Sequence, residues 1–383
     1  MNLTGFANHQ HDLSLLKDSG FTEVIVGMRE FSRFGRLEHD TFLKLSSDAK
    51  ALGMRVIFEW DILMTEENFD VCASKIHSYM DHFDVLRVQD PGAFHWAVHR
   101  CDKPIHFIAE SGNHNLEALK GWCEAGGNKL ERIVLSIELA RDTLKEYCTK
   151  LPVPCELLGL GRILLFYSPR SLLAPLSPEK IVVNEEIEAL GESEESPHKG
   201  FPVLENRHGT FMFHIKEFCL VEYASDLASI GLSWLRIDQR FNERNFTPEA
   251  VKIVKREAMF ENFKAEYPQE LMRGFYHVNK SDVLFPKLKN FRLQRQGDFI
   301  GEVLEAEKAS HLAILVKNPK GFKVGDKFQI IHPKGEIFEG EVHSLRDVNL
   351  VEVSVVPQGE LALIPFINGV WVKSQLFFRE SSK

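Results

Sequence analysis

The chain has 383 residues, of which 44% are hydrophobic and 26% are charged. This balance is typical of a globular protein long enough for a large core and a second domain. The formal net charge of -9 and the pI near 6.0 argue against broad, non-specific binding to polyanions, although they leave room for a local basic groove.

Neither the start of the chain nor its hydropathy carries a targeting signal. Residues 1–10 contain no basic region followed by an apolar stretch, and no later segment approaches the ~20 apolar residues that cross a bilayer. We therefore expect a soluble, cytoplasmic protein with no membrane partner. The six cysteines form no C-x-x-C pair, which argues against a zinc site or a disulfide framework and predicts reduced, mostly buried thiols.

Over the first 270 residues, short apolar runs alternate with helical patterns, as in the βαβ units of a parallel sheet. The predicted strands are 3–6, 23–27, 55–60, 85–88, 104–109, 132–137, 156–160 and 233–237. Helical spacing is clear at 41–52 and 66–80, and Gly20 and Gly53 stand where helix C-caps favour glycine. Eight such units most simply close into a (β/α)8, TIM-barrel-like domain. A doubly wound sheet is the alternative, but no G-x-G-x-x-G follows the first strand.

Residues 155–174 read Cys-Glu-Leu-Leu-Gly-Leu-Gly-Arg-Ile-Leu-Leu-Phe-Tyr-Ser-Pro-Arg-Ser-Leu-Leu-Ala. The first half predicts a strand buried on both sides, and Gly159 and Gly161 indicate close approach to other backbone. The second half predicts a loop, because Pro169 fixes its own φ and restricts Ser168.

Two composition changes divide the rest of the chain. Six glutamates among glycine, serine and proline at 185–199 predict a solvated acidic loop inserted at 184–200. We expect the barrel domain to span 1–275, a linker 276–290 and an all-β barrel domain 291–383. The predicted strands of the last domain are 299–304, 312–316, 327–331, 338–342 and 350–355, separated by glycine and proline turns.

Active-site residues of a (β/α)8 barrel follow the carboxyl ends of its strands. This rule selects Glu138, Asp90 and Glu110 as candidate general acids or bases, and Arg162 and Arg240 as clamps for an anion. Further candidate ligand-binding residues are Asn113, Asp238 and Glu156. The alternatives are that Asp90, which precedes Pro91-Gly92, and Glu138 only cap helices or join ion pairs, and that the arginines pair with Asp238 or Glu156.

Known hydrolase motifs are absent from the sequence. No H-E-x-x-H occurs, and His95 and His99, four apart on a probable helix, lack a carboxylate at motif spacing, so we predict no metal site. No G-x-S-x-G nucleophile elbow occurs either.

Residues 155–174 resemble the signature of the U32 family of collagenase-like peptidases, some of which take part in oxygen-independent hydroxylation of RNA or quinone precursors. The residues in register are Glu156, Gly161, Tyr167, Ser168, Arg170, Leu172 and Leu173. Residues 88–92, Val-Gln-Asp-Pro-Gly, match a further family turn, and residues 34–36 are similar to its Gly-x-Arg stretch, which makes Arg36 a candidate ligand-binding residue. The C-terminal domain resembles the family's C-terminal, translation-factor-like barrel.

The resemblance fails at the cysteines that hold an iron–sulfur cluster in other members of the family. Leu164 and Ser171 stand at the first two positions, and no cysteine lies between Cys155 and Cys219, where the third would fall. Only Cys219 lies near the position of the family's last cluster cysteine. Because leucine cannot ligate iron and serine is a poor substitute for thiolate, we expect no such cofactor.

Three functions follow as hypotheses. The first is a degenerate U32 protein that works as a cluster-less accessory or ligand-binding subunit, partnered by another U32 protein, a peptide, RNA or a small anion. The second is an active peptidase that uses the barrel-mouth carboxylates. The third is an RNA-binding or modification factor acting through residues 291–383, although their twelve basic and twelve acidic residues make that domain neutral.

Overall fold

The computed structural model describes residues 1–176, 186–192, 199–242, 244–277, 298–333 and 335–379. The chain divides into two compact units, Met1–Asn279 and Lys280–Lys383. Most of the predicted linker, 278–290, lies outside the described residues. Tyr276, which we placed in that linker, is only 1% exposed and belongs to the first unit, where its hydroxyl donates to Asp226 Oδ2 at 2.6 Å.

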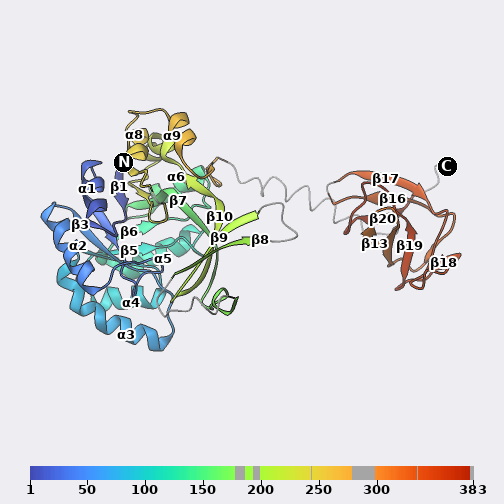
Figure 1. Cartoon of the computed structure of the whole chain (residues 1–383), viewed down its shortest axis with the longest axis horizontal. Helices are drawn as coiled ribbons and strands as arrows, with labels where there is room; N and C mark the ends of the chain where they lie inside the picture. Colours follow the sequence, from blue (N-terminus) through green and yellow to red (C-terminus); the bar gives the residue numbers. More distant parts are fainter. Residues whose placement is uncertain (177–185, 193–198, 243, 278–297, 334, 380–383) are drawn as a thin grey trace. The chain divides into compact units, whose positions relative to one another are not determined.

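The first unit is a closed barrel of eight parallel strands, as the sequence predicted (Figure 1). The strands are β1 (Asn2–Gly5), β2 (Glu23–Val26), β3 (Arg55–Trp60), β4 (Val85–Val88), β5 (Ile105–Ile108), β6 (Leu130–Val134), β7 (Cys155–Ser168) and β11 (Trp234–Ile237). Strands β2 to β7 pair in sequence order, β7 pairs with β11 and β11 with β1. A parallel bridge between Phe6 and Ile25 closes the ring.

Helices follow the strands and cover the outside of the barrel (Figure 1). They are α1 (Gln10–Asp18), α2 (His39–Ala51), α3 (Glu66–Ile76), α4 (Pro91–Arg100), α5 (Leu116–Gly126), α6 (Arg141–Lys150), α7 (Ala224–Ser229), α8 (Thr247–Val254) and α9 (Phe260–Glu266). Short 3-10 turns are η1 (His77–His82), η2 (Gly127–Lys129), η3 (Ala174–Leu176) and η5 (Val221–Tyr223). The predicted helix 66–80 is therefore α3 continued by η1. Gly20 and Gly53 follow α1 and α2 with φ of 95° and 66°, the conformation that favours glycine.

The prediction of a loop in the second half of 155–174 was wrong as far as Ser168, whereas residues 169–173 form neither helix nor strand. The prediction of a solvated loop at 184–200 was wrong for 187–192 and 199–200, which are strands, and 184–185 and 193–198 lie outside the described residues. Strand β7 continues to Ser168, and β8 (Ile187–Glu192), β9 (Lys199–Asn206) and β10 (Gly209–Cys219) extend the sheet in the order β7-β10-β9-β8, all antiparallel. A two-residue strand, β12 (Leu271–Met272), pairs with β10. The glutamates of β8 alternate with Ile187 and Ala189, so a strand period of two was hidden by the acidic composition.

The glycines of β7 do approach other groups closely. A Cβ on Gly161, where φ is 155°, would lie 3.0 Å from the backbone oxygen of Asp238, as the sequence indicated. At Gly159 the close neighbour is instead the side chain of Leu235, whose Cγ would lie 2.4 Å from the added Cβ. The lack of a Cβ at both positions therefore lets β7 lie close against β11 and the segment that follows it.

The second unit is an antiparallel all-β domain with its own apolar core, centred on residues such as Ile300, Ile314 and Leu376. Its strands are β13 (Phe299–Glu307), β14 (His311–Val316), β15 (Phe322–Lys323), β16 (Lys327–Ile331), β17 (Ile337–Glu341), β18 (Val355–Val356), β19 (Leu361–Pro365) and β20 (Gln375–Phe378). The main sheet has the order β17-β16-β20-β13-β14-β19. The prediction of a strand at 350–355 was wrong, since only the two residues of β18 form one there, and β15, β19 and β20 were not predicted.

In the described part of the chain, no helix is both long and apolar enough to span a membrane.

Candidate ligand-binding site at the barrel mouth

A cavity of about 620 Å³ lies at the carboxyl ends of the barrel strands. The loops after β1, β2, β3, β5, β6 and β11 contribute to it, and so do β7 and β10. Its polar lining includes Arg33, Glu59, Asp61, Glu110, His114, Glu138, Arg162, Arg236, Asp238 and Arg240. Its apolar wall includes Phe34, Leu164, Phe213 and Phe241. Five of the predicted site residues, Glu110, Glu138, Arg162, Asp238 and Arg240, therefore come together at one cavity, as the strand-end rule implied.

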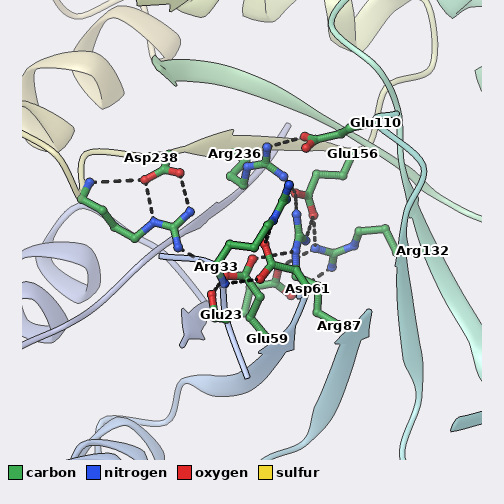
Figure 2. A network of polar contacts seen from close by, with 12 residues as sticks. Glu23, Arg33, Glu59, Asp61, Arg87, Glu110, Arg132, Glu156, Arg236 and Asp238 are labelled. Atoms are coloured by element: carbon green, nitrogen blue, oxygen red, sulfur yellow. Dashed lines mark hydrogen bonds and ion pairs between the residues drawn. The ribbon is translucent and has the colours of Figure 1, made fainter. Parts of the chain in front are cut away.

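Arginines already bind two of the carboxylates that line this cavity (Figure 2). Arg236 Nη2 donates to Glu110 Oε1, and Arg240 Nη2 donates to Asp238 Oδ2 at 2.8 Å. Burial alone would raise the pKa of Asp238, but the charges of Arg240 and Arg236 outweigh burial and lower it. Asp238 is thus held as an ionised partner of arginine. Both carboxylates are already hydrogen-bonded by arginines, an arrangement that suits structural pairing better than proton transfer.

A second group of charged residues, Arg33, Glu59 and Asp61, also lines the cavity. Arg33 Nε is 2.9 Å from Asp61 Oδ2, and Glu59 accepts hydrogen bonds from Ser32 Oγ at 2.7 Å and Arg240 Nη1 at 3.2 Å. Burial and the nearby charge of Asp61 raise the pKa of Glu59. Burial would also raise the pKa of Asp61, but Arg33 outweighs it and keeps that pKa low. The two neighbouring carboxylates therefore differ in their readiness to hold a proton.

The centre of the barrel is filled by ions where most such barrels carry branched aliphatic side chains. Glu156 on β7 accepts from Arg87 on β4, from Arg132 on β6 at 3.1 Å and from Arg236 on β11 at 3.3 Å (Figure 2). Arg132 also binds Glu23 on β2, with Nη2 to Oε2 at 2.9 Å. Burial would raise the pKa of Glu156, but the three arginines outweigh burial and lower it. Glu156, predicted to bind ligand, is fully buried and joins strands across the barrel.

Arg162 differs from the other arginines of the cavity. Its nearest carboxylate contact in the described residues is Glu217 Oε1, 3.9 Å from Nε, beyond hydrogen-bond distance. Its guanidinium lies 4.7 Å from the ring centroid of Phe241 and 5.5 Å from that of Phe213. Burial lowers the pKa of Arg162, because the cation has lost water without gaining a bound carboxylate. This side chain can accept an anion without first breaking a close ion pair.

Glu138 lies at the rim with its side chain 59% exposed. Its Oε2 is 3.7 Å from His114 Nε2, and the loop of His114 is fixed by Tyr147, whose hydroxyl donates to the His114 carbonyl at 2.6 Å. His114 was not predicted as a site residue. An imidazole beside a solvated carboxylate is an arrangement that can exchange protons with a bound molecule.

Besides Glu156, three predicted residues lie outside the mouth cavity. Asp90 Oδ1 accepts from Ala93 N at 3.0 Å and caps α4, the alternative that its place before Pro91 suggested. The Asn113 side-chain oxygen accepts from Trp122 Nε1 at 2.8 Å. Arg36 pairs with Glu186 across 3.5 Å.

Sequence reasoning did not select Arg33, Asp61, Arg87, Arg132 or Glu23. One signal could have found the last three, because each is a charge within a short, mostly apolar strand, where an ion needs a buried partner. Asp61 directly follows β3 and Arg33 lies in the loop between β2 and α2, so neither carried that signal.

The residues at the expected cluster positions do not suit an iron–sulfur cluster. Leu164 packs with Phe34, Phe211 and Phe213 in an apolar group, and Ser171 is exposed. Cys219 is only 1% exposed. In the backbone register of β7 and β10 it lies opposite Leu160, whereas Leu164 lies opposite Phe213, so Cys219 and Leu164 are at different points along the two strands. Within the described ranges, no group of three or more His, Cys, Asp or Glu could hold a metal ion. No step of the chemistry is therefore assigned to a cluster.

Comparison with known proteins links both units to one family. The family model described as peptidase family U32 matches residues 9–281, and that described as the peptidase family U32 C-terminal domain matches residues 295–373. Among curated proteins, tRNA hydroxylation protein P of Haemophilus influenzae is 20% identical over 319 residues, covering 66% of this chain and 68% of its own.

Two solved structures carry the same family name. The C-terminal domain of a putative U32 peptidase from Geobacillus thermoleovorans is 15% identical, with a TM-score of 0.20, and covers 22% of this chain and 93% of its own. The U32 peptidase Mk0906 is 10% identical, with a TM-score of 0.40, and covers 62% of this chain and 92% of its own.

Proposed function

This chain belongs to peptidase family U32, and we propose that it acts there as a ligand-binding accessory protein in RNA hydroxylation, without an iron–sulfur cluster of its own. The similarity to tRNA hydroxylation protein P supports the choice of process. The replacement of cluster ligands by Leu164 and Ser171 supports the accessory role, because neither residue supplies a soft thiolate.

One observation carries the ligand-binding part of the proposal. In a cavity where other arginines bind lining carboxylates, Arg162 stands between Phe213 and Phe241 with no carboxylate in hydrogen-bond range among the described residues. A cation beside aromatic rings suits a small molecule that combines an anionic group with a flat apolar part.

Calorimetric titration tests this assignment, with uridine monophosphate, benzoate and inorganic phosphate as probes. We expect at least one ring-bearing anion to bind, and Arg162→Gln to weaken it about tenfold or more, as the loss of a charge-assisted hydrogen bond implies. Arg244→Gln is the matched control, because Arg244 is exposed and pairs with Glu249 outside the cavity lining. Equal affinity in the wild type and Arg162→Gln would overturn the assignment.

Peptide hydrolysis is a second candidate, favoured by the Glu138–His114 contact at the rim. If this pair activates water, the wild type should cleave a peptide library, and cleavage should be lost in both Glu138→Gln and His114→Gln. Cleavage that persists in both variants would come from a contaminating protease.

The proposed accessory role requires a partner that supplies what this chain lacks. We expect an anaerobic native pull-down of the full chain to recover a second U32 protein with a complete set of cluster cysteines, RNA, or both. An iron-free chain that comes down alone would contradict the accessory role while leaving ligand binding at Arg162 to be judged by titration.

A further inference from the structure

We propose that β8 is a docking edge for an extended segment of a partner protein, in which basic residues alternate with aliphatic ones. The segment would add to the sheet as a further strand. This inference is independent of the ligand bound in the mouth.

The first observation is the position of β8 in the sheet. It ends the order β7-β10-β9-β8, and its backbone pairs with β9 on one side only among the residues that the structure describes. Every second residue of such an edge points its N–H and C=O outward, which forms a template for an added strand.

The second observation is the division of β8 into two faces, which its register fixes. On one face, Ala189 of β8 lies opposite Val203 of β9. The same row continues through Met212 of β10 to Phe166 of β7. This row crosses four strands, and each of its side chains is partly exposed. A strand added beside Ala189 would extend this face with aliphatic side chains.

The opposite face of β8 carries Glu188, Leu190 and Glu192. Glu188 pairs with Leu204, one of the side chains packed against Phe34 and Phe211, so this face is on the side of the barrel mouth. Leu190 is 73% exposed. A strand opposite this row gains most from basic residues facing the two glutamates and an aliphatic residue facing Leu190.

Charge decides between possible occupants. A second copy of this chain that paired β8 with β8 would bring the glutamates of two edges together, which is unfavourable. RNA is repelled by the same glutamates. A basic, aliphatic peptide strand satisfies both faces, and the sequence Lys-Val-Leu-Val-Lys does so in either strand direction.

Fluorescence polarisation with a labelled peptide containing Lys-Val-Leu-Val-Lys tests the proposal on the full chain. We expect saturable binding, and binding at least tenfold weaker for the peptide with Glu-Val-Leu-Val-Glu. Leu190→Lys should also weaken binding about tenfold, because it replaces the aliphatic contact with a positive charge that repels the lysines of the peptide. Met259→Lys is the matched control, since Met259 is 70% exposed in the same unit but away from β8.

Backbone methylation separates strand addition from simple charge attraction. An added strand uses the N–H groups of alternate residues, so N-methylation of one alternate set should abolish binding, whereas methylation of the other set should be tolerated. The proposal is overturned if no peptide binds, if both methylated peptides bind equally, or if Leu190→Lys and Met259→Lys behave alike. A dimer that Leu190→Lys disrupts, or RNA that competes with the peptide at β8, would also overturn it in favour of that occupant.

Discussion

Glu156 and Arg87 face each other inside the barrel, from β7 and β4, through two parallel hydrogen bonds of 2.9 and 3.0 Å between side chains that are both fully buried. Arg132 and Arg236 bind the same carboxylate. The desolvation of these ions is offset only while all the partners are present, so Glu156 orders the arginine network and, through Arg236, the position of Glu110 in the mouth.

Replacement of Glu156 by glutamine should destabilise the barrel severely. Three buried guanidinium groups would lose their common counter-charge, and breaking a buried ion pair from one side costs about 3–5 kcal/mol in the free energy of unfolding. Urea denaturation measures the change. The control is Glu117→Gln, whose carboxylate is 82% exposed and pairs with Lys120, and which should cost less than about 1 kcal/mol. Similar losses in the two variants would mean that the network contributes little.

The stability of the first unit should depend on pH through His106. Its side chain is fully buried, its Nε2 donates to Glu131 Oε1 at 3.0 Å, and burial lowers its pKa from 6.5 to about 3. Between these values the unfolded chain binds the proton and the folded chain does not, so the free energy of unfolding falls as the pH falls below 6.5. The slope should approach about 1.4 kcal/mol per pH unit.

Urea denaturation at pH 7, 6 and 5 checks this dependence. His106→Gln should remove that part of the slope, whereas His95→Gln, at an exposed position on α4, should keep it. Burial also lowers the pKa of His208, so a smaller slope of the same sign should persist in His106→Gln. An unchanged slope in His106→Gln would show that another group titrates.

Two glycines should respond to alanine in opposite directions. A Cβ at Gly159 would meet the side chain of Leu235, so Gly159→Ala should cost about 1–3 kcal/mol through overpacking. Gly121, inside α5, has nothing within 4 Å of an added Cβ, so Gly121→Ala should stabilise by roughly 0.5–1 kcal/mol. Thermal unfolding compares the two, and a stable Gly159→Ala variant would mean that β7 and β11 can separate slightly.

Cys219 should be inert and the protein should hold no iron. Burial raises the pKa of the Cys219 thiol to about 12, so the thiolate that ligates iron or attacks a disulfide reagent is scarce at pH 8. We expect native protein to leave Cys219 unmodified by a disulfide reagent, and anaerobically prepared protein to lack iron and sulfide. Stoichiometric iron with sulfide would contradict the assignment of a cluster-less chain.

The sequence by itself determined the barrel, its eight strands and the gathering of five candidate residues at one cavity. Apolar runs and helical spacing are local properties, and parallel strands bring their carboxyl ends to one side whatever the loops contain. That is why Glu110, Glu138, Arg162, Asp238 and Arg240 could be placed together before any coordinates were known.

Only the tertiary structure decided what these residues can do. An isolated sequence shows no partners, so Glu110 and Asp238 resembled free acids until Arg236 and Arg240 were found bound to them. Composition likewise concealed β8, because its glutamates suggested solvent whereas pairing with β9 makes it a strand. Long-range pairing sets both the charge state of a side chain and the conformation of a polar segment, and local sequence does not encode which distant groups will meet.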